Sequence, residues 1–237
     1  MHELNKRITF GGEIVPAYLA SAPKIIRAKR KMTSTPIPGS NREIVEMEDA
    51  WEPYDQPFSL FVGDGSENSI QSVLADVARV LYKEGWQVLQ DDYEPDCYRL
   101  AYYEGPFDVE NRKTRVGVFN VTFRCRAERF LISGNIEVDV PSGNKIFNPT
   151  AFKAKPLIHI EGSGDGTVTV NDTTMTFTNI ADYLNVDCEK EDVYRLPAEN
   201  RNNNMSGNFP VLDSGDNLVT FTGGITAVKI TPRWWTL

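Results

Sequence analysis

The sequence is poor in the residues and runs that mark several classes of protein. It has 3 cysteines in 237 residues, Cys97, Cys125 and Cys188. Their odd number and wide spacing argue against a disulfide framework and favour reduced, buried thiols made in a cytosol. No run reaches the ~18 consecutive apolar residues of a membrane helix. No apolar segment follows the start of the chain, so we expect no secretory signal and no membrane partner.

Positive charge is also in short supply. The chain has 25 Lys and Arg against 33 Asp and Glu, a formal net charge of −8. A protein that wraps nucleic acid needs clustered cations to bind phosphates, so this balance argues against that class. It is compatible with a protein that lets nucleic acid pass without adhering. The 41% hydrophobic and 24% charged residues are typical of a folded chain, and the length suggests one or two domains.

Motifs for catalysis are absent. The sequence has no nucleophile elbow, phosphate-binding Gly-Lys-Ser/Thr loop, His-Glu-Xaa-Xaa-His or paired Cys-Xaa-Xaa-Cys. Of its two histidines, His159 lies in a strand-like run, where we expect a structural imidazole. The acidic segment 91–96 and Asp165 lack the spacing of a calcium loop, so solvated turns are expected there. We therefore predict no enzyme, cofactor or metal, although a glycosidase carboxylate pair is set by distance in space and leaves no sequence signature.

What is present is mostly an alternating pattern. In residues 116–123, Gly117, Phe119, Val121 and Phe123 face one way and form an apolar face. Similar strands are predicted at 98–103, 157–160, 167–170, 175–178, 218–222 and 226–230. Turn-forming clusters such as 161–166 and 212–217 separate them. Short strands with frequent turns predict β-sandwiches or barrels.

One segment has helical periodicity instead. Its apolar residues recur at steps of three and four: Ile70, Val73, Leu74, Val77 and Leu81. Asn68 or Ser69 can cap the start, and Gly85 lies where a helix stop is expected. This pattern predicts a helix over about 69–84, with its apolar face on a sheet.

Residues 24–55 carry a divided charge pattern. Basic residues precede the turn-like segment 36–40: Lys24, Arg27, Lys29, Arg30 and Lys31. Acidic residues follow it: Glu43, Glu46, Glu48, Asp49, Glu52 and Asp55. We predict a hairpin with one basic and one acidic arm, supported by cross-strand charge pairs worth about 0.2–1 kcal/mol each. Such a projecting polar ribbon buries no core of its own, so it either embraces a neighbour or is a solvated hairpin without a partner.

Aromatic residues offer a further possible site. Tyr102, Tyr103, Trp234 and Trp235 could stack on sugar rings; the favoured alternative is that they close the cores or fill subunit contacts. The two tryptophans are expected in, or just after, the last strand. The turn-forming residues at 141–144 and 148–149 indicate a boundary or linker region.

The last ninety residues carry short motifs in a fixed order. These are Asn-Pro-Thr-Ala-Phe at 148–152, Ala-Lys-Pro-Leu-Ile-His-Ile-Glu-Gly at 154–162, Asn-Val-Asp-Cys-Glu at 185–189, Phe-Pro-Val-Leu at 209–212, Ser-Gly-Asp-Asn-Leu at 214–218 and Ile-Thr-Pro-Arg-Trp-Trp-Thr-Leu at 230–237. This order resembles the distal tail protein (Dit) family of long, flexible-tailed bacteriophages. The charged hairpin, the single helix and the strand ending in Arg-Cys-Arg-Ala-Glu-Arg-Phe (124–130) are compatible with it.

The resemblance implies a mainly β protein with two domains. Residues 1–134 would form an N-terminal β-sandwich with one helix and a projecting hairpin belt (about 24–50) that builds a ring. Residues 135–237 would form a galectin-like β-sandwich, whose last residues can pack back on the first domain. The chain is short for the family, so large inserted carbohydrate-binding modules are not expected.

The same resemblance implies a structural protein of the virion, assembled in the host cytoplasm. Family members form a hexameric ring that joins the tail tube protein to the tail-associated hub protein, can hold receptor-binding proteins, and leaves a channel for DNA. The belt residues expected between subunits are Lys29, Arg30, Lys31, Ile37, Arg42, Glu43 and Glu46. The alternative function is a carbohydrate-binding module for host-surface glycans.

Overall fold

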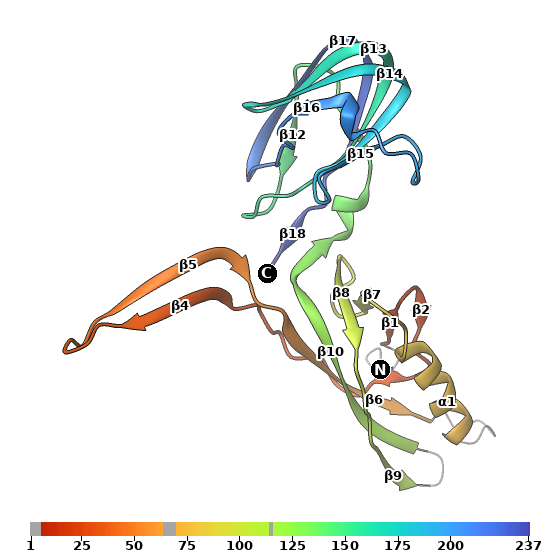
Figure 1. The fold of residues 1–237 in the computed structure, drawn as a ribbon. Coiled ribbons are helices and arrows are strands. Elements are labelled where there is room, and N and C mark those ends of the chain that lie inside the picture. The colour runs from red at the N-terminus through yellow and green to blue at the C-terminus, as the bar shows by residue number, and fades with distance from the viewer. Residues whose placement is uncertain (1–5, 64–69, 114–115) are drawn as a thin grey trace. The chain divides into compact units, whose positions relative to one another are not determined.

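The chain is mainly β, as the alternating pattern predicts (Figure 1). The computed structural model describes residues 6–63, 70–113 and 116–237. The chain divides into two compact units, Met1–Arg129 together with Leu237, and Phe130–Thr236. This boundary lies five residues before the predicted one, which follows residue 134. The turn-forming residues 141–144 lie inside the second unit, where Asn144 begins a strand.

The first unit is built on a nine-stranded sheet in the order β2-β1-β7-β8-β10-β6-β3, with β9 and β18 pairing with β10 outside this path. The strands of this sheet are β1 (Ile8–Phe10), β2 (Glu13–Ile14), β3 (Tyr18–Leu19), β6 (Tyr54–Val62), β7 (Gln87–Asp91), β8 (Cys97–Tyr103), β9 (Val109–Lys113), β10 (Val116–Leu131) and β18 (Trp235–Thr236). The strands β4 (Arg30–Pro36) and β5 (Glu43–Trp51) form a separate hairpin, which lies between β3 and β6 in the sequence.

The central pair of this sheet, β10 and β6, confirms the predicted alternation. Gly117, Phe119, Val121 and Phe123 are buried, and the side chains between them are exposed or half-buried. They lie opposite Val62, Leu60, Phe58 and Gln56 in an antiparallel ladder. The rings of Phe10 and Phe58 pack on Phe123, with centroids 4.9 and 5.9 Å away, and form the centre of the core.

The helix α1 (Ile70–Leu81) packs on this core through Val77, Val80 and Leu81. Its predicted caps, Asn68 and Ser69, lie outside the described residues. The helix ends three residues before the predicted end at 84. The Lys83 amide donates to the Leu81 carbonyl (2.9 Å) instead of continuing the i→i−4 ladder.

The second unit contains a seven-stranded sheet in the order β11-β17-β13-β14-β15, with β12 pairing with β17 and β16 with β14. Its strands are β11 (Val138–Asp139), β12 (Asn144–Asn148), β13 (Leu157–Val170), β14 (Thr173–Asp187), β15 (Asp192–Tyr194), β16 (Met205–Gly207) and β17 (Gly215–Thr231), followed by β18 (Trp235–Thr236). Two short 3-10 helices are η1 (Ile132–Asn135) and η2 (Asn202–Asn204).

The prediction that residues 161–166 separate two strands is wrong. These residues lie within the single strand β13. The register of β13 against β17 shifts between Gly162 and Gly166. The two backbones approach so closely that a Cβ on Gly162 would lie 2.3 Å from the Gly224 carbonyl oxygen. These glycines therefore form a bulged stretch that bends long strands around one core.

Candidate assembly interface

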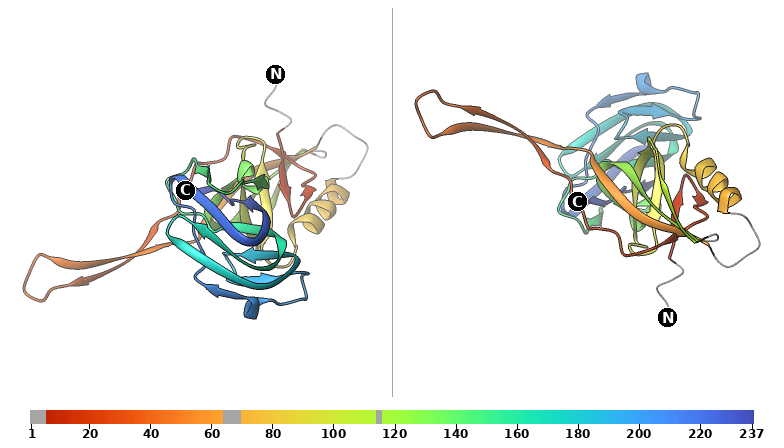
Figure 2. Two further views of the ribbon diagram at one scale, coloured as in Figure 1. Left: turned by 90° about the horizontal axis from the view of Figure 1, so that it is seen from above. Right: turned by 90° about the horizontal axis from the view of Figure 1, so that it is seen from below.

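The charged segment forms a two-stranded hairpin of β4 (Arg30–Pro36) and β5 (Glu43–Trp51), which pair only with each other (Figures 1 and 2). The Ile37 amide donates to the Arg42 carbonyl (3.1 Å), and Gly39 has a φ of +74° that favours glycine. The arms extend from the sheet of the first unit with exposed side chains along nearly their whole length. The hairpin thus has no core of its own.

The seven predicted belt residues all lie on this hairpin or at its base, and all are exposed: Lys29, Arg30, Lys31, Ile37, Arg42, Glu43 and Glu46. The structure brings Ile37 and Arg42 together across the turn. The three cations lie at the base of the first arm, where the Lys29 carbonyl accepts from the Glu52 amide (2.8 Å). Glu43 begins the second arm, and its carboxylate accepts a hydrogen bond from the Ser34 hydroxyl.

The cross-strand charge pairing that the sequence predicts along the hairpin occurs at one position of the described arms. The residues of the described arms pair as Met32 with Met47, Thr33 with Glu46, Ser34 with Val45, Thr35 with Ile44 and Pro36 with Glu43. Among the described hairpin residues, the one ion pair is Arg30 with Asp49, at 3.8 Å, and the Asp49 side chain is almost fully exposed. The register shifts between Arg30 and Met32, and the cations lie at the base of the hairpin, where Arg30 also donates from Nε to the Glu48 carbonyl (2.9 Å).

The hairpin also carries an apolar face that was not predicted from the sequence. Met32, Val45 and Met47 are 45%, 44% and 64% exposed, and the register places them on one face. We refer to these three residues as the hairpin apolar face. The available signal was the alternation of Val45 and Met47 with acidic residues. Exposed apolar side chains on an unsupported hairpin mark an interaction surface.

The acidic segment 91–96 is neither a calcium loop nor a solvated turn. The Asp91 carboxylate accepts from the amides of Tyr93 (3.0 Å) and Glu94 (3.1 Å) and from the Arg99 guanidinium (3.0 Å). Glu94 forms ion pairs with both Arg99 and Arg129. The side chains of Asp91 and Arg99 are buried, so this network is a structural part of the first unit.

The cysteines and the histidine of the described ranges pack within the fold. These ranges hold no group of three or more His, Cys, Asp or Glu side chains arranged for a metal. Burial raises the pKa of the Cys125 and Cys188 thiols to about 12, which keeps them protonated at neutral pH. His159 Nδ1 lies 2.8 Å from Asn185 Oδ1, and its ring stacks on Tyr183, as a structural imidazole does. No helix in the described part of the chain has the length and apolarity to cross a membrane.

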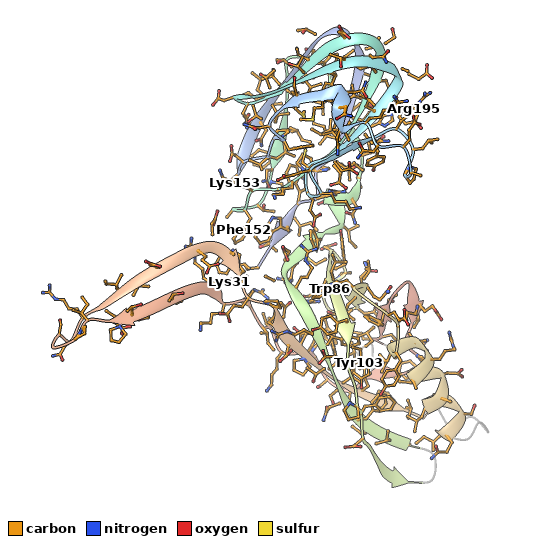
Figure 3. All side chains as sticks on the ribbon, viewed as in Figure 1. Lys31, Trp86, Tyr103, Phe152, Lys153 and Arg195 are labelled. Atoms are coloured by element: carbon orange, nitrogen blue, oxygen red, sulfur yellow. The ribbon has the colours of Figure 1, made fainter. Side chains whose placement is uncertain are left out.

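The four aromatics considered for sugar stacking are divided between the two units, with Tyr102 and Tyr103 in the first and Trp234 and Trp235 in the second. Tyr103 packs on Phe123 in the first unit, whereas Trp234 is buried in the core of the second. Trp235 stacks on Phe152 at 4.4 Å and donates from Nε1 to the Lys153 carbonyl at 2.8 Å; Figure 3 labels Phe152 and Lys153. These contacts support the interpretation that Tyr103, Trp234 and Trp235 serve packing.

Comparison with known proteins finds matches in structure and none in sequence. No family model matches the sequence, and no curated protein matches it. Among solved structures, the Dit protein of phage SPP1 superposes with a TM-score of 0.78 over 98% of this chain and 99% of that chain, at 11% identity. The chain has the Dit fold. This fold confirms the resemblance drawn from the ordered motifs.

Two further structures share the Dit fold. A chain of the phage P2 baseplate in its activated conformation with calcium has a TM-score of 0.55 and 12% identity, covering 95% of this chain and 96% of that chain. The corresponding strontium structure gives 0.50 and 13%, covering 95% and 97%. The SPP1 protein is described as a paradigm of the hub adsorption apparatus in phages that infect Gram-positive bacteria.

Proposed function

We propose that this protein is a structural component of a phage tail tip and not an enzyme. The observation that carries the proposal is the Dit fold, which extends over 98% of this chain and 99% of the SPP1 protein. The three solved structures compared above are a hub protein and two baseplate structures. A scaffold protein needs contact surfaces and no reactive pocket, which agrees with the packed aromatics and protonated thiols.

Copies of the chain close into a hexameric ring through residues 1–134, with the hairpin belt (about 24–50) of each copy on the next. A ring requires a heterologous, head-to-tail contact. The hairpin supports such a contact because its apolar face and most of its charges have no partner within the described chain. The belt residues are Lys29, Arg30, Lys31, Ile37, Arg42, Glu43 and Glu46.

The ring joins the tail tube protein to the tail-associated hub protein in the virion, after assembly in the host cytoplasm. Residues 135–237 form the outward galectin-like domain that holds receptor-binding proteins. DNA passes through the ring without specific binding. The net charge of −8 favours this passage, because like charges repel phosphates.

Native mass spectrometry and negative-stain microscopy of the purified full chain test this function, alone and with the tail tube or hub protein. Closed rings of six copies are the expected result. A chain that is monomeric under every one of these conditions would overturn the proposal. A glycan array on the same preparation distinguishes the carbohydrate-binding alternative, which predicts binding that is lost when a surface Trp or Tyr is replaced.

A further inference from the structure

A head-to-tail ring needs two different surfaces on each copy. The giving surface reaches onto one neighbouring copy, and the receiving surface is covered by the other neighbour. The hairpin is the giving surface under the proposed function, on which this inference rests. The receiving surface must lie on another part of the same chain. It must also be apolar where it meets Met32, Val45 and Met47, because burying a charge against methionine and valine carries a large desolvation cost.

The outward face of β7 and β8 has the required chemistry. Trp86 is 47% exposed and its ring meets Tyr102 edge-on at 4.8 Å. Val88 is 38% exposed and pairs with Leu100 across the two strands. We refer to Trp86, Val88, Leu100 and Tyr102 as the β7–β8 patch; Figure 3 labels Trp86. None of the four side chains is charged.

The opposite face of β7 and β8 is buried in the core of the first unit. Leu89 and Ala101 alternate with the patch residues along β7 and β8, and both are fully buried in the core of the first unit. Ile14, 57% exposed, extends the open face, since it pairs with Thr9, which in turn pairs with Gln90. The sheet is therefore packed on one face and leaves an apolar surface on the other.

The geometry points to a second copy as the occupant: we infer that the β7–β8 patch receives the hairpin apolar face of the neighbouring chain. The hairpin leaves the sheet at the β6–β3 edge, and β10 separates that edge from the patch. Giving and receiving surfaces thus lie apart, as a head-to-tail contact needs. An arm of 9 residues spans about 30 Å at ~3.3 Å per residue, comparable with the width of a unit of this size.

Disulfide trapping between two tagged chains tests this contact. One chain carries Met47→Cys and the other Val88→Cys, and the natural cysteines contribute little because all three are buried. The matched control replaces Met47→Cys with Glu46→Cys, its neighbour on the opposite face of the hairpin. We expect the Met47–Val88 combination to give about tenfold more inter-chain disulfide under mild oxidation than the control combination.

The outcomes separate this inference from the proposed function. Rings that form but give no preferential Met47–Val88 disulfide overturn the patch as receiver and leave the ring proposal standing. A chain that never assembles overturns both. Preferential disulfide formation in rings supports both.

A second variant tests the patch without new cysteines. Trp86→Ala should raise the protein concentration needed for half-maximal ring formation by about tenfold, because an exposed tryptophan at the centre of an interface is a typical energetic hot spot. Phe147→Ala is the matched control, because Phe147 is an exposed aromatic (63%) of the second unit. Circular dichroism checks that both variants keep the fold, and equal ring formation by the two variants would contradict the inference.

Discussion

At the scale of single residues, burial decides whether a charge is paired. Arg99 and Asp91 are buried and bind each other at 3.0 Å, whereas Lys31 and Glu46 on the hairpin are exposed and form no ion pair within the described residues. An unpaired charge is costly in the interior and tolerable in water. Buried charges therefore need a partner within the unit, and exposed ones are available to another chain.

Replacing Arg99 with methionine should destabilise the first unit by about 3–5 kcal/mol, because Asp91 then stays buried without its cation. The matched control is Arg124→Met, which removes an exposed pair with Asp55 and should cost less than about 1 kcal/mol. Urea denaturation measures both free energies of unfolding. Equal losses in the two variants would contradict the structural role of the buried network.

The pair Asp187–Arg233 predicts a pH dependence. Burial acts to raise the pKa of Asp187. The hydrogen bonds from Arg233, at 2.7 and 3.0 Å, the charge of Arg233 and the hydrogen bonds from the Glu189 and Lys190 amides together outweigh burial and hold the pKa below its ordinary 3.8. A lowered pKa stabilises the fold above the ordinary value, and this contribution is lost as the pH falls through the folded-state pKa.

Arg233→Gln should therefore lower Tm strongly at about pH 7, and its difference from the unchanged protein should shrink below about pH 4. Thermal melts followed by circular dichroism at both pH values measure this. A Tm difference between the two proteins that stays constant across that pH range would show that the Asp187–Arg233 ion pair does not cause it.

At the scale of elements, the hairpin and the chain end have opposite roles. Residues 31–49 of the hairpin are all exposed and add no side chain to the core of the first unit, whereas Trp51 at the base of the hairpin packs against that core. The segment after β17 does the reverse: Trp234 is buried in the second unit, and its carbonyl accepts from the Leu131 amide at 2.9 Å. Removal of each element should therefore affect a different property.

Deleting residues 32–42 should abolish rings and leave the fold intact. The reason is that these residues bury no side chain in the first unit. Circular dichroism reports the fold and native mass spectrometry reports the rings. Rings that persist after the deletion would refute the belt role.

Truncation after Ile230 should destabilise the second unit by about 3–5 kcal/mol, because it removes buried Trp234 together with Arg233, the partner of Asp187. The point variant Trp234→Ala separates the packing contribution from the ion pair. Differential scanning calorimetry of the truncated protein and of the Trp234→Ala variant provides the measurement. Unchanged melting would contradict the placement of Trp234 in the core.

At the scale of the whole molecule, an acidic assembly should not retain DNA. The net charge of −8 leaves each copy with an excess of carboxylates. We expect ring preparations to leave the mobility of linear double-stranded DNA unchanged in a native gel at physiological salt. A salt-sensitive retardation would contradict free passage of DNA.

The strands were predictable where period-two alternation is unambiguous, as in residues 116–123, because one buried face imposes it on the sequence. The continuity of the strand through residues 161–166 was not predictable, because glycines occur in both turns and bulges. Only the approach of Gly224 across the sheet decides between them. The Asp91–Arg99–Arg129 network was also missed, since Arg129 lies far from Asp91 in sequence and the sheet brings the network together.

The sequence alone determined the mainly β class, the helix and the hairpin, because local periodicity, turn residues and charge runs encode these features directly. Its ordered C-terminal motifs supplied a resemblance to the Dit family, and the structural comparison confirmed the Dit fold. Only the tertiary structure decided which residues of the hairpin face each other, and hence that Arg30–Asp49 is the one ion pair among its described residues and that its methionines share one face. Register depends on turn geometry and a bulge, which shift every side chain while the amino-acid pattern stays the same.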